Sequence, residues 1–483
     1  MHLPVIFKVL SLLSAIVSLS MVLPLGWSLW DGSSDGKAFL LSISAGLIFS
    51  AVLFMAGKNA DYNDIGVKDG FLVVSLSWIF ASLIGALPFY ISGTIPTFAG
   101  AFFESASGFT TTGASVLSDI EAVPRGILFW RSLTHWLGGM GIIVLSLAIL
   151  PFLGVGGMEL FKAEVPGPIP EKITPRIQQT ALYLWGVYAF LTVAETVLLL
   201  LGGMNLFESL THTFGTVATG GFSPLNRSVG QYGSAYFDWI ITVFMFLSGI
   251  NFVLHYRLLR GHFRPLARDD EFRTYLWIVL FCIAVISADL LFRGNYDSIA
   301  EALRYSAFQV VSIITTTGFA TADFELWPSF TQLILLLLMF AGACAGSTGG
   351  GMKILRLLIL SRHTRAELKR VLHPHAVISV KVGGKVIDTR IQSSVTSFLI
   401  LYVAVFIAGV FFMTSLGMDM ESAMSGVAAS LGNVGPGLGS LGPMDNYSAV
   451  PEAGKWLFSL LMLMGRLELY TVLLLFFPGT WRK

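Results

Sequence analysis

Four short segments of the chain combine glycine with hydroxyl-bearing or amide side chains. They are residues 109–114, 216–222, 314–319 and 431–436, with the sequences FTTTGA, TVATGGF, ITTTGF and LGNVGP. Glycine reaches positive φ without steric penalty, so a neighbouring carbonyl can be turned toward a chosen point. A ring of such carbonyls, with threonine hydroxyls beside them, can replace the water shell of a cation. We call these segments the tips, numbered in chain order, and predict that they coordinate a dehydrated cation.

Within each tip the predicted ligands are a glycine anchor and the two residues before it. The anchors recur at intervals of about 100 residues, each between two apolar stretches, which is typical of an internal repeat. A single Thr-Thr-Gly is more typical of an ordinary turn. The prediction of a cation site therefore depends on the presence of four such tips in the chain. The fourth tip departs from the others, and four equal contributions are therefore not expected. The predicted ligand residues are Thr111, Thr112, Gly113, Ala218, Thr219, Gly220, Thr316, Thr317, Gly318, Asn433, Val434 and Gly435.

The composition places these tips in a membrane protein. Of the 483 residues, 54% are hydrophobic and 12% are charged, whereas a soluble domain carries roughly 25% charged residues. A spanning helix needs about 20 mostly apolar residues. Stretches of that kind predict ten spans, at about residues 5–28, 38–57, 70–92, 126–152, 178–201, 236–258, 274–293, 328–345, 394–415 and 456–478. We interpret the first as a retained helix and not as a cleaved signal peptide.

Basic residues indicate how the spans are oriented, because cytoplasmic loops carry an excess of Lys and Arg. Segments 257–273 and 353–390 are rich in both residues, and we expect them in the cytoplasm together with the N- and C-termini. The tips lie in long segments with few basic residues, which we place on the outer side. The basic segments either serve orientation alone or also bind a cytosolic partner.

The tips are too apolar for solvated loops. Non-helical backbone at membrane depth is tolerated only where it is buried in protein or lines a water-filled path. The sequence therefore predicts an all-α polytopic membrane protein with four span, pore-loop, span repeats around one central pore, plus two extra N-terminal transmembrane helices. The predicted divisions are 1–68 for the N-terminal pair, then 69–165, 166–270, 271–390 and 391–483 for repeats 1 to 4.

The eighth span runs into a glycine-rich segment, residues 342–351. Each glycine costs a helix about 1 kcal/mol relative to alanine, so we expect an intramembrane loop that gates the pore from the cytoplasmic side. Close helix packing by small residues is the alternative. A nucleotide-binding P-loop is rejected because Met352 stands where the lysine is needed. The predicted gate residues are Gly346, Gly349, Gly350, Gly351 and Arg466.

Arg466 lies near the centre of the last span. A guanidinium stays charged in a protein, so burying it is unfavourable unless it faces water, a partner or a carbonyl-lined path. Two interpretations remain open: a charge barrier to cations beneath the tips, or a structural bridge to loop carbonyls or a carboxylate.

The four span, pore-loop, span units and their tips resemble the Trk/Ktr/HKT superfamily of potassium transporters, over residues from about 70 to the end. The additional N-terminal pair of spans is similar to the TrkH/TrkG branch. This resemblance implies potassium uptake through a K+-selective pore in the bacterial inner membrane. It also implies a homodimer and a cytosolic nucleotide-binding regulatory subunit resembling TrkA. Glycine at all four anchors implies a preference for potassium over sodium.

The alternatives are a Na+-coupled or Na+-permeable transporter of the same fold and a membrane-embedded enzyme. An enzyme requires a convergent nucleophile, base or metal cluster, and the sequence lacks an Asp-rich motif or a zinc-ligand pattern. A net charge of +1 argues against nucleic acid as a partner, and we expect no cofactor other than the transported K+. Acidic residues before the tips, at 104, 208, 301 and 421, have unequal offsets that argue against one cation-attracting ring.

Overall fold

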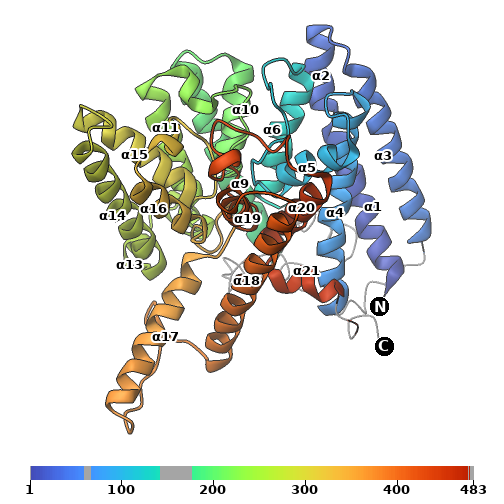
Figure 1. Cartoon of the computed structure of the whole chain (residues 1–483). Coiled ribbons are helices and arrows are strands. Elements are labelled where there is room, and N and C mark those ends of the chain that lie inside the picture. Colours follow the sequence, from blue (N-terminus) through green and yellow to red (C-terminus); the bar gives the residue numbers. More distant parts are fainter. Residues whose placement is uncertain (1, 59–66, 142–176, 477, 479–483) are drawn as a thin grey trace.

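The computed structural model describes residues 2–58, 67–141, 177–476 and 478 (Figure 1). These residues form a helical bundle with one short antiparallel hairpin, in which β1 (Lys381–Val382) pairs with β2 (Lys385–Val386). The second half of the span predicted at 126–152 and the predicted boundary between repeats 1 and 2 fall outside the described residues.

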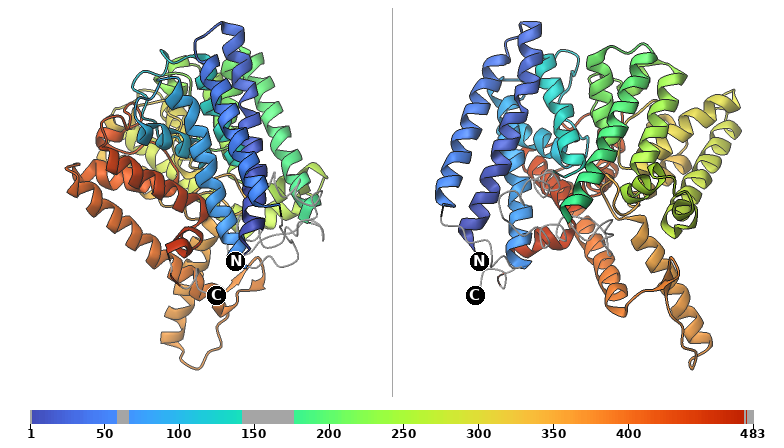
Figure 2. Two further views of the ribbon diagram at one scale, coloured as in Figure 1. Left: turned by 90° about the vertical axis from the view of Figure 1, so that its right-hand side faces the viewer. Right: turned by 180° about the vertical axis from the view of Figure 1, so that it is seen from behind.

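The N-terminal pair of spans packs along one edge of the bundle (Figure 2). Helices α1 (Leu3–Ser20) and α2 (Val22–Asp31) form one span, and α3 (Gly36–Ala56) returns beside it. Gly46 allows the close approach of the two spans, because a Cβ at this position would collide with the hydroxyl of Ser18.

Each of the four repeats contributes a spanning helix, a short helix that ends at a tip, and a helix after the tip. The spanning helices are α4 (Val67–Ile91), α9 (Ile177–Leu201), α14 (Asp270–Phe292) and α18 (Thr389–Ser415). The short helices before the tips are α5 (Phe98–Phe109), α10 (Leu206–Val217), α15 (Ile299–Ile314) and α19 (Met420–Gly432). The helices after the tips are α6 (Arg125–Gly139), α11 (Ala235–Ser248) with α12 (Phe252–Leu259), α16 (Ser329–Met339) with α17 (Ile354–Leu372), and α20 (Glu452–Leu467) with α21 (Leu469–Phe476). Shorter elements are η2 (Ser228–Tyr232), α13 (Arg264–Arg268), η3 (Phe324–Leu326) and η4 (Gly439–Leu441).

Within the described residues, six of the predicted spans are long and apolar enough to cross a membrane, with α1 and α2 counted together, and a seventh is added if the bent pair α11 and α12 is one span. The span predicted over 236–258 is broken, because α11 and α12 meet at 103°. Asn251 causes part of this break: its side chain accepts a hydrogen bond from the amide of Val253 at 2.8 Å and so begins α12 as an N-cap. The last span is also interrupted, since Glu468 has a φ of 62° between α20 and α21.

Helix α17 and the hairpin extend beyond the bundle as an arm (Figure 1). The arm contains the basic segment 353–390, and both chain termini lie at the same end of the molecule (Figure 2). The basic segment and the termini therefore share one side, as the orientation rule predicts.

Candidate functional site

The four tips share one backbone conformation. In each, a residue in the left-handed region is followed two residues later by a glycine with positive φ. The first set is Thr111, Thr219, Thr316 and Asn433, with φ of 54°, 55°, 59° and 55°. The second set is Gly113, Gly221, Gly318 and Gly435, with φ of 85°, 80°, 80° and 100°.

A common pattern of hydrogen bonds fixes this conformation. The amide that follows each left-handed residue donates to the carbonyl five residues earlier in the short helix, which closes the helix end. The bonds run from Thr112 to Ser107, Gly220 to Gly215, Thr317 to Ser312 and Val434 to Ala429, at 2.9, 2.7, 2.8 and 2.8 Å. The fourth tip thus differs in its side chains but not in its backbone.

The structure shifts the register of the second tip by one residue relative to the sequence prediction. Gly221 has the positive φ that matches the other anchors, whereas Gly220 does not. A Cβ at Gly220 would instead collide with the ring of His135. The three matched positions are therefore Thr219, Gly220 and Gly221, and Ala218 lies at the end of α10. The glycine doublet allows both registers in the sequence, and only the packing selects one.

The tips meet in a closed ring. A Cβ built on each anchor glycine would collide with a carbonyl oxygen of the next tip, and the fourth tip meets the first. These pairs are Gly113 with the carbonyl of Gly220, Gly221 with Thr317, Gly318 with Val434, and Gly435 with Thr112. All four anchors also line one cavity of about 80 Å³. Glycine is thus required at the anchors both by the backbone conformation and by close approach.

Threonine in the left-handed region is unusual, because a β-branched side chain is strained there. Such a conformation costs on the order of 1–3 kcal/mol per residue and persists only where the surroundings enforce it. Thr111 accepts a hydrogen bond from Arg466, and Thr316 accepts one from the amide of Gly350 at 2.7 Å. Asn433 donates to the hydroxyl of Thr112 at 2.9 Å. Arg466 and the glycine-rich loop therefore hold the first and third tips, and Asn433 joins the fourth tip to the first.

A buried ion pair braces the first and second tips from behind. Arg131 Nε lies 2.6 Å from Glu104 Oε1, and the two side chains are 3% and 0% exposed. The Glu104 carboxylate also accepts the amide of Val116 at 2.8 Å, while Arg131 Nη1 donates to the carbonyl of Ser223 at 2.9 Å. The guanidinium also lies over the ring of Phe222, 3.6 Å from its centroid. The pair therefore fixes the segments that leave both tips.

His135 links the first and second repeats, and Tyr447 holds the fourth tip. His135 Nδ1 lies 2.7 Å from the carbonyl of Gly108, and its Nε2 accepts the amide of Phe222 at 3.2 Å, so the ring is neutral with the proton on Nδ1. The hydroxyl of Tyr447 donates to the carbonyl of Gly435 at 2.8 Å. These residues were not predicted from the sequence, although Arg131 and His135 are ionisable residues one helical turn apart in a predicted span.

The predicted break in the eighth span is confirmed, because α16 ends at Met339 and α17 begins only at Ile354. The loop between them lies against three repeats. Thr348 donates to the carbonyls of Val217 and Ser248 at 3.1 and 3.2 Å, and Gly350 donates to the third tip. A Cβ at Gly350 would collide with Asn433 of the fourth tip.

The other predicted gate glycines lie in the same loop. Gly346 and Gly351 have φ of 71° and 61°, as a tight loop requires. The carbonyl of Gly346 accepts the amide of Phe252 at 3.0 Å, at the break between α11 and α12. Gly349 lies below the third tip, where a Cβ would approach the carbonyl of Thr315 to 3.1 Å. The glycine-rich loop therefore packs against the break between α11 and α12 in repeat 2.

Arg466 joins the loop to the first tip and to the end of α6. Its Nη2 donates to the carbonyls of Gly138 and Gly139 at 2.7 and 2.9 Å. Its Nη1 donates to the carbonyl of Thr348 at 2.5 Å and to the hydroxyl of Thr111 at 3.1 Å. The bridge to loop carbonyls that the sequence analysis left open is therefore present, and the positive charge lies directly beneath a tip.

The acidic residues before the tips do not share one environment. Glu104 is buried in its ion pair, whereas Glu208, Glu301 and Glu421 lie in the first turns of their helices, where a carboxylate favours the helix N-terminus. A different carboxylate, Glu325, lies against Gly442 near the anchor cavity.

The sequence of this chain is similar to those of known proteins along nearly its whole length. A family model described as TrkH, cation transport protein, matches residues 35–481. The chain belongs to the TrkH cation transport family. It is 41% identical to the Trk system potassium uptake protein TrkH of Salmonella typhimurium, over all of both chains. It is 36% identical to the Trk system potassium uptake protein TrkG of Escherichia coli, over 100% of this chain and 99% of that one.

The fold agrees with a solved member of the family. The crystal structure of the potassium transporter TrkH from Vibrio parahaemolyticus superposes with a TM-score of 0.90 at 38% identity, with both chains fully covered. The predicted resemblance and the all-α multi-span membrane fold are therefore confirmed. Membership of a transport family also decides against the membrane-embedded enzyme.

The buried ion pair between Arg131 and Glu104 leads to a prediction about stability. We expect Arg131→Met to lower the free energy of unfolding by about 3–5 kcal/mol, because it leaves the Glu104 carboxylate buried without its partner. The matched control is Arg293→Met, which removes an arginine that is 55% exposed from its ion pair with Asp289. We expect that control to lose less than about 1 kcal/mol. Denaturant unfolding in detergent measures both, and equal losses would contradict the brace.

Glu325 generates a prediction about pH. Partial burial and the nearby charges of Asp323 and Asp445 raise the pKa of Glu325 from 4.5 to about 7. Because the folded pKa is the higher one, this group stabilises the fold fully below the unfolded pKa, and that stability is lost as pH rises through the folded pKa. We expect Glu325→Gln to raise the thermal midpoint at about pH 8 and to flatten its fall above about pH 5. Glu452→Gln, at an exposed carboxylate, is the control, and an unchanged pH profile in Glu325→Gln would refute the assignment.

Proposed function

We propose that this protein takes up potassium through a pore at the centre of the four repeats, and that the ring of tips is its selectivity filter. The observation that carries the proposal is the closure of the ring, in which each anchor glycine meets a carbonyl of the next tip. A bare cation in an apolar medium is unfavourable by tens of kcal/mol on Born reasoning, on the order of the hydration energy it has lost. Carbonyl oxygens that converge on one axis supply the replacement.

The proposed K+ ligands are the matched residues of the tips, with Thr219, Gly220 and Gly221 in the second. Their equivalent backbone supports similar carbonyl contributions from all four repeats. The names of the relatives support potassium over sodium, since both are called potassium uptake proteins. A Na+-permeable transporter of the same fold would show a lower K+/Na+ permeability ratio.

We further propose that the intramembrane loop, with Gly346, Gly349, Gly350, Gly351 and Arg466, closes the path on the cytoplasmic side. Its contacts with the second, third and fourth repeats, and through Arg466 with the first, support this assignment. At about 4 Å and an effective dielectric of about 20, the guanidinium repels a monovalent cation by about 4 kcal/mol. That energy corresponds to roughly a thousandfold change in occupancy.

The cellular setting belongs to the same proposal. We place the protein in the bacterial inner membrane with both termini cytoplasmic, as a homodimer that binds a nucleotide-binding regulatory subunit resembling TrkA. The basic arm of α17 and the hairpin, on the side of both termini, supports a cytosolic docking surface. The five divisions predicted from the sequence remain the proposed domain boundaries.

Substitution of an anchor tests the filter. We expect Gly113→Ser to lower the K+/Na+ permeability ratio at least about tenfold, or about 1.4 kcal/mol, because the side chain meets a carbonyl of the second tip. Flux in proteoliposomes measures the ratio. Gly93→Ser is the matched control, since Gly93 has a φ of 75° in the same repeat but open space around it. A wild-type ratio in Gly113→Ser would remove this residue from the filter.

Two substitutions of Arg466 test the proposed gate. They distinguish a role of its positive charge from a role of its hydrogen bonds to carbonyl oxygens. We expect Arg466→Ala to raise basal potassium flux, because it removes the barrier charge. Arg466→Lys keeps the charge but loses the planar fork that binds several carbonyls, so we expect flux near wild type with a lower thermal midpoint. Reduced flux and reduced thermal stability in both variants would instead establish a purely structural role.

A further inference from the structure

The first turn of α14 contacts both the intramembrane loop and the cytoplasmic arm. From this geometry we infer that Glu271 is a positioning residue, whose carboxylate holds the loop in its obstructing position. The inference rests on the proposed gate, because it concerns what keeps that gate in place.

One carboxylate oxygen of Glu271 makes both contacts. Oε1 accepts the amide of Ala345 at 2.7 Å and the amide of Leu355 at 2.9 Å. The first amide belongs to the loop and the second to the first turn of α17, so the two bonds enclose the glycine-rich residues 346–351. Glu271 is 7% exposed. Hydrogen bonds to a charged group are roughly twice as strong as neutral ones, and more so away from water.

The loop needs such an external clamp because its own sequence does not fix its shape. Four glycines lie among residues 346–351 and give the backbone wide freedom. Its internal backbone bonds run from Gly342 to the carbonyl of Met352 at 2.8 Å, from Ile354 to the carbonyl of Ala343 at 3.2 Å, and from Ser347 to the carbonyl of Cys344 at 3.2 Å. The side chain of Lys353 is buried and donates to the carbonyls of Gly349 and Gly350.

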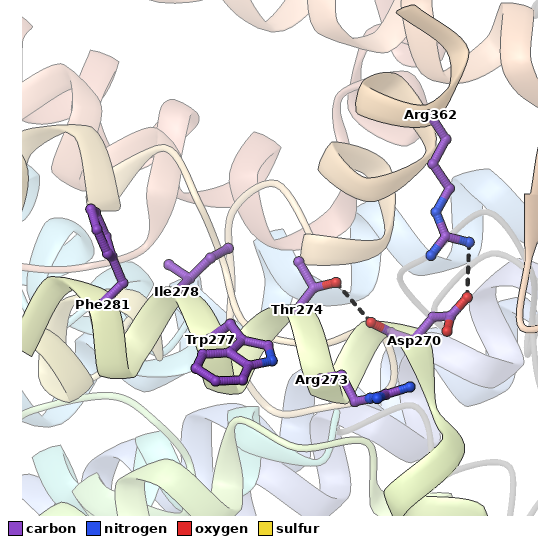
Figure 3. Close-up of a pocket in the computed structure, with 7 residues that line it drawn as sticks. All are labelled: Asp270, Arg273, Thr274, Trp277, Ile278, Phe281 and Arg362. Carbon is purple, nitrogen blue, oxygen red and sulfur yellow. Dashed lines mark hydrogen bonds and ion pairs between the residues drawn. The ribbon is translucent and has the colours of Figure 1, made fainter. Parts of the chain in front are cut away.

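Neighbouring residues hold in place the first turn of α14, which bears Glu271. Asp269 caps α14 by accepting the amide of Phe272 at 2.7 Å. Asp270 accepts Arg362 Nη1 of α17 at 2.8 Å (Figure 3). It also accepts the amide of Gly383 of the hairpin at 2.8 Å. Asp270 and Arg362 lie at one end of a groove beside α14 (Figure 3). The turn that bears Glu271 is therefore fixed from the cytoplasmic side as well as by its helix.

The native thiol of Cys344 reports directly on the loop. It is adjacent to Ala345 and 1% exposed, and Cys282 is the chain's only other cysteine. In a Cys282→Ala background, the rate at which a charged methanethiosulfonate modifies Cys344 therefore measures loop opening. We expect Glu271→Ala to raise that rate at least about tenfold, the factor expected from the loss of one charge-assisted hydrogen bond. Glu271→Gln retains an acceptor oxygen and should fall between Glu271→Ala and the parent.

Glu452→Ala, at an exposed carboxylate in α20, is the matched control and should leave the rate unchanged. Potassium flux measured on the same proteoliposomes separates the two claims. A faster Cys344 reaction with raised flux and an unchanged K+/Na+ ratio supports the clamp and the gate together. A faster reaction with unchanged flux supports the clamp but refutes the loop as the gate. A parental Cys344 rate in folded Glu271→Ala, judged by its size-exclusion profile, overturns the inference.

Discussion

Backbone polar groups at membrane depth impose the constraint on which the rest of this structure depends. Without water, each unsatisfied N–H or C=O is unfavourable by several kcal/mol, on the order of a lost hydrogen bond in hydrocarbon. Four irregular tips and one irregular loop lie in the centre of the bundle, so each must have partners or face an aqueous path. The shared bonding pattern at the tips, the buried brace and the contacts of the loop all meet this requirement.

The same contacts join the repeats to one another. Arg131 reaches from α6 to Ser223 after the second tip, the amide of Tyr447 donates to the carbonyl of Ser115 in the first repeat, and Arg466 links the last repeat to the first. A ring built in this way resists independent movement of one tip, since strained residues such as Thr316 persist only while their neighbours hold them. Rigidity of the ring and mobility of a gate must therefore reside in different segments.

The intramembrane loop meets that division of roles. Its glycines allow several backbone conformations, and the partners that select one come from other elements: the bend in repeat 2, the third tip, Arg466 and Glu271. An element held by a few external hydrogen bonds can change its position without disturbing a packed core. The arm is joined to the base of this element through Asp270 and Arg362, on the side of the proposed docking surface.

The sequence alone determined the membrane class, the repeat and the position of the tips, because apolar length and glycine spacing are local properties that the bilayer constrains strongly. It also predicted the break at the eighth span, from the low helix propensity of glycine. It did not determine the register of Gly220 and Gly221, the bend at Asn251 or the partners of Glu104 and Glu271. Apart from the local N-cap of Asn251 on Val253, these features depend on residues about 30 to 100 positions apart that meet only after folding, and the local pattern of one sequence does not show which distant residues will meet. Tertiary packing therefore decided which glycine turns its backbone and which buried charge finds its partner.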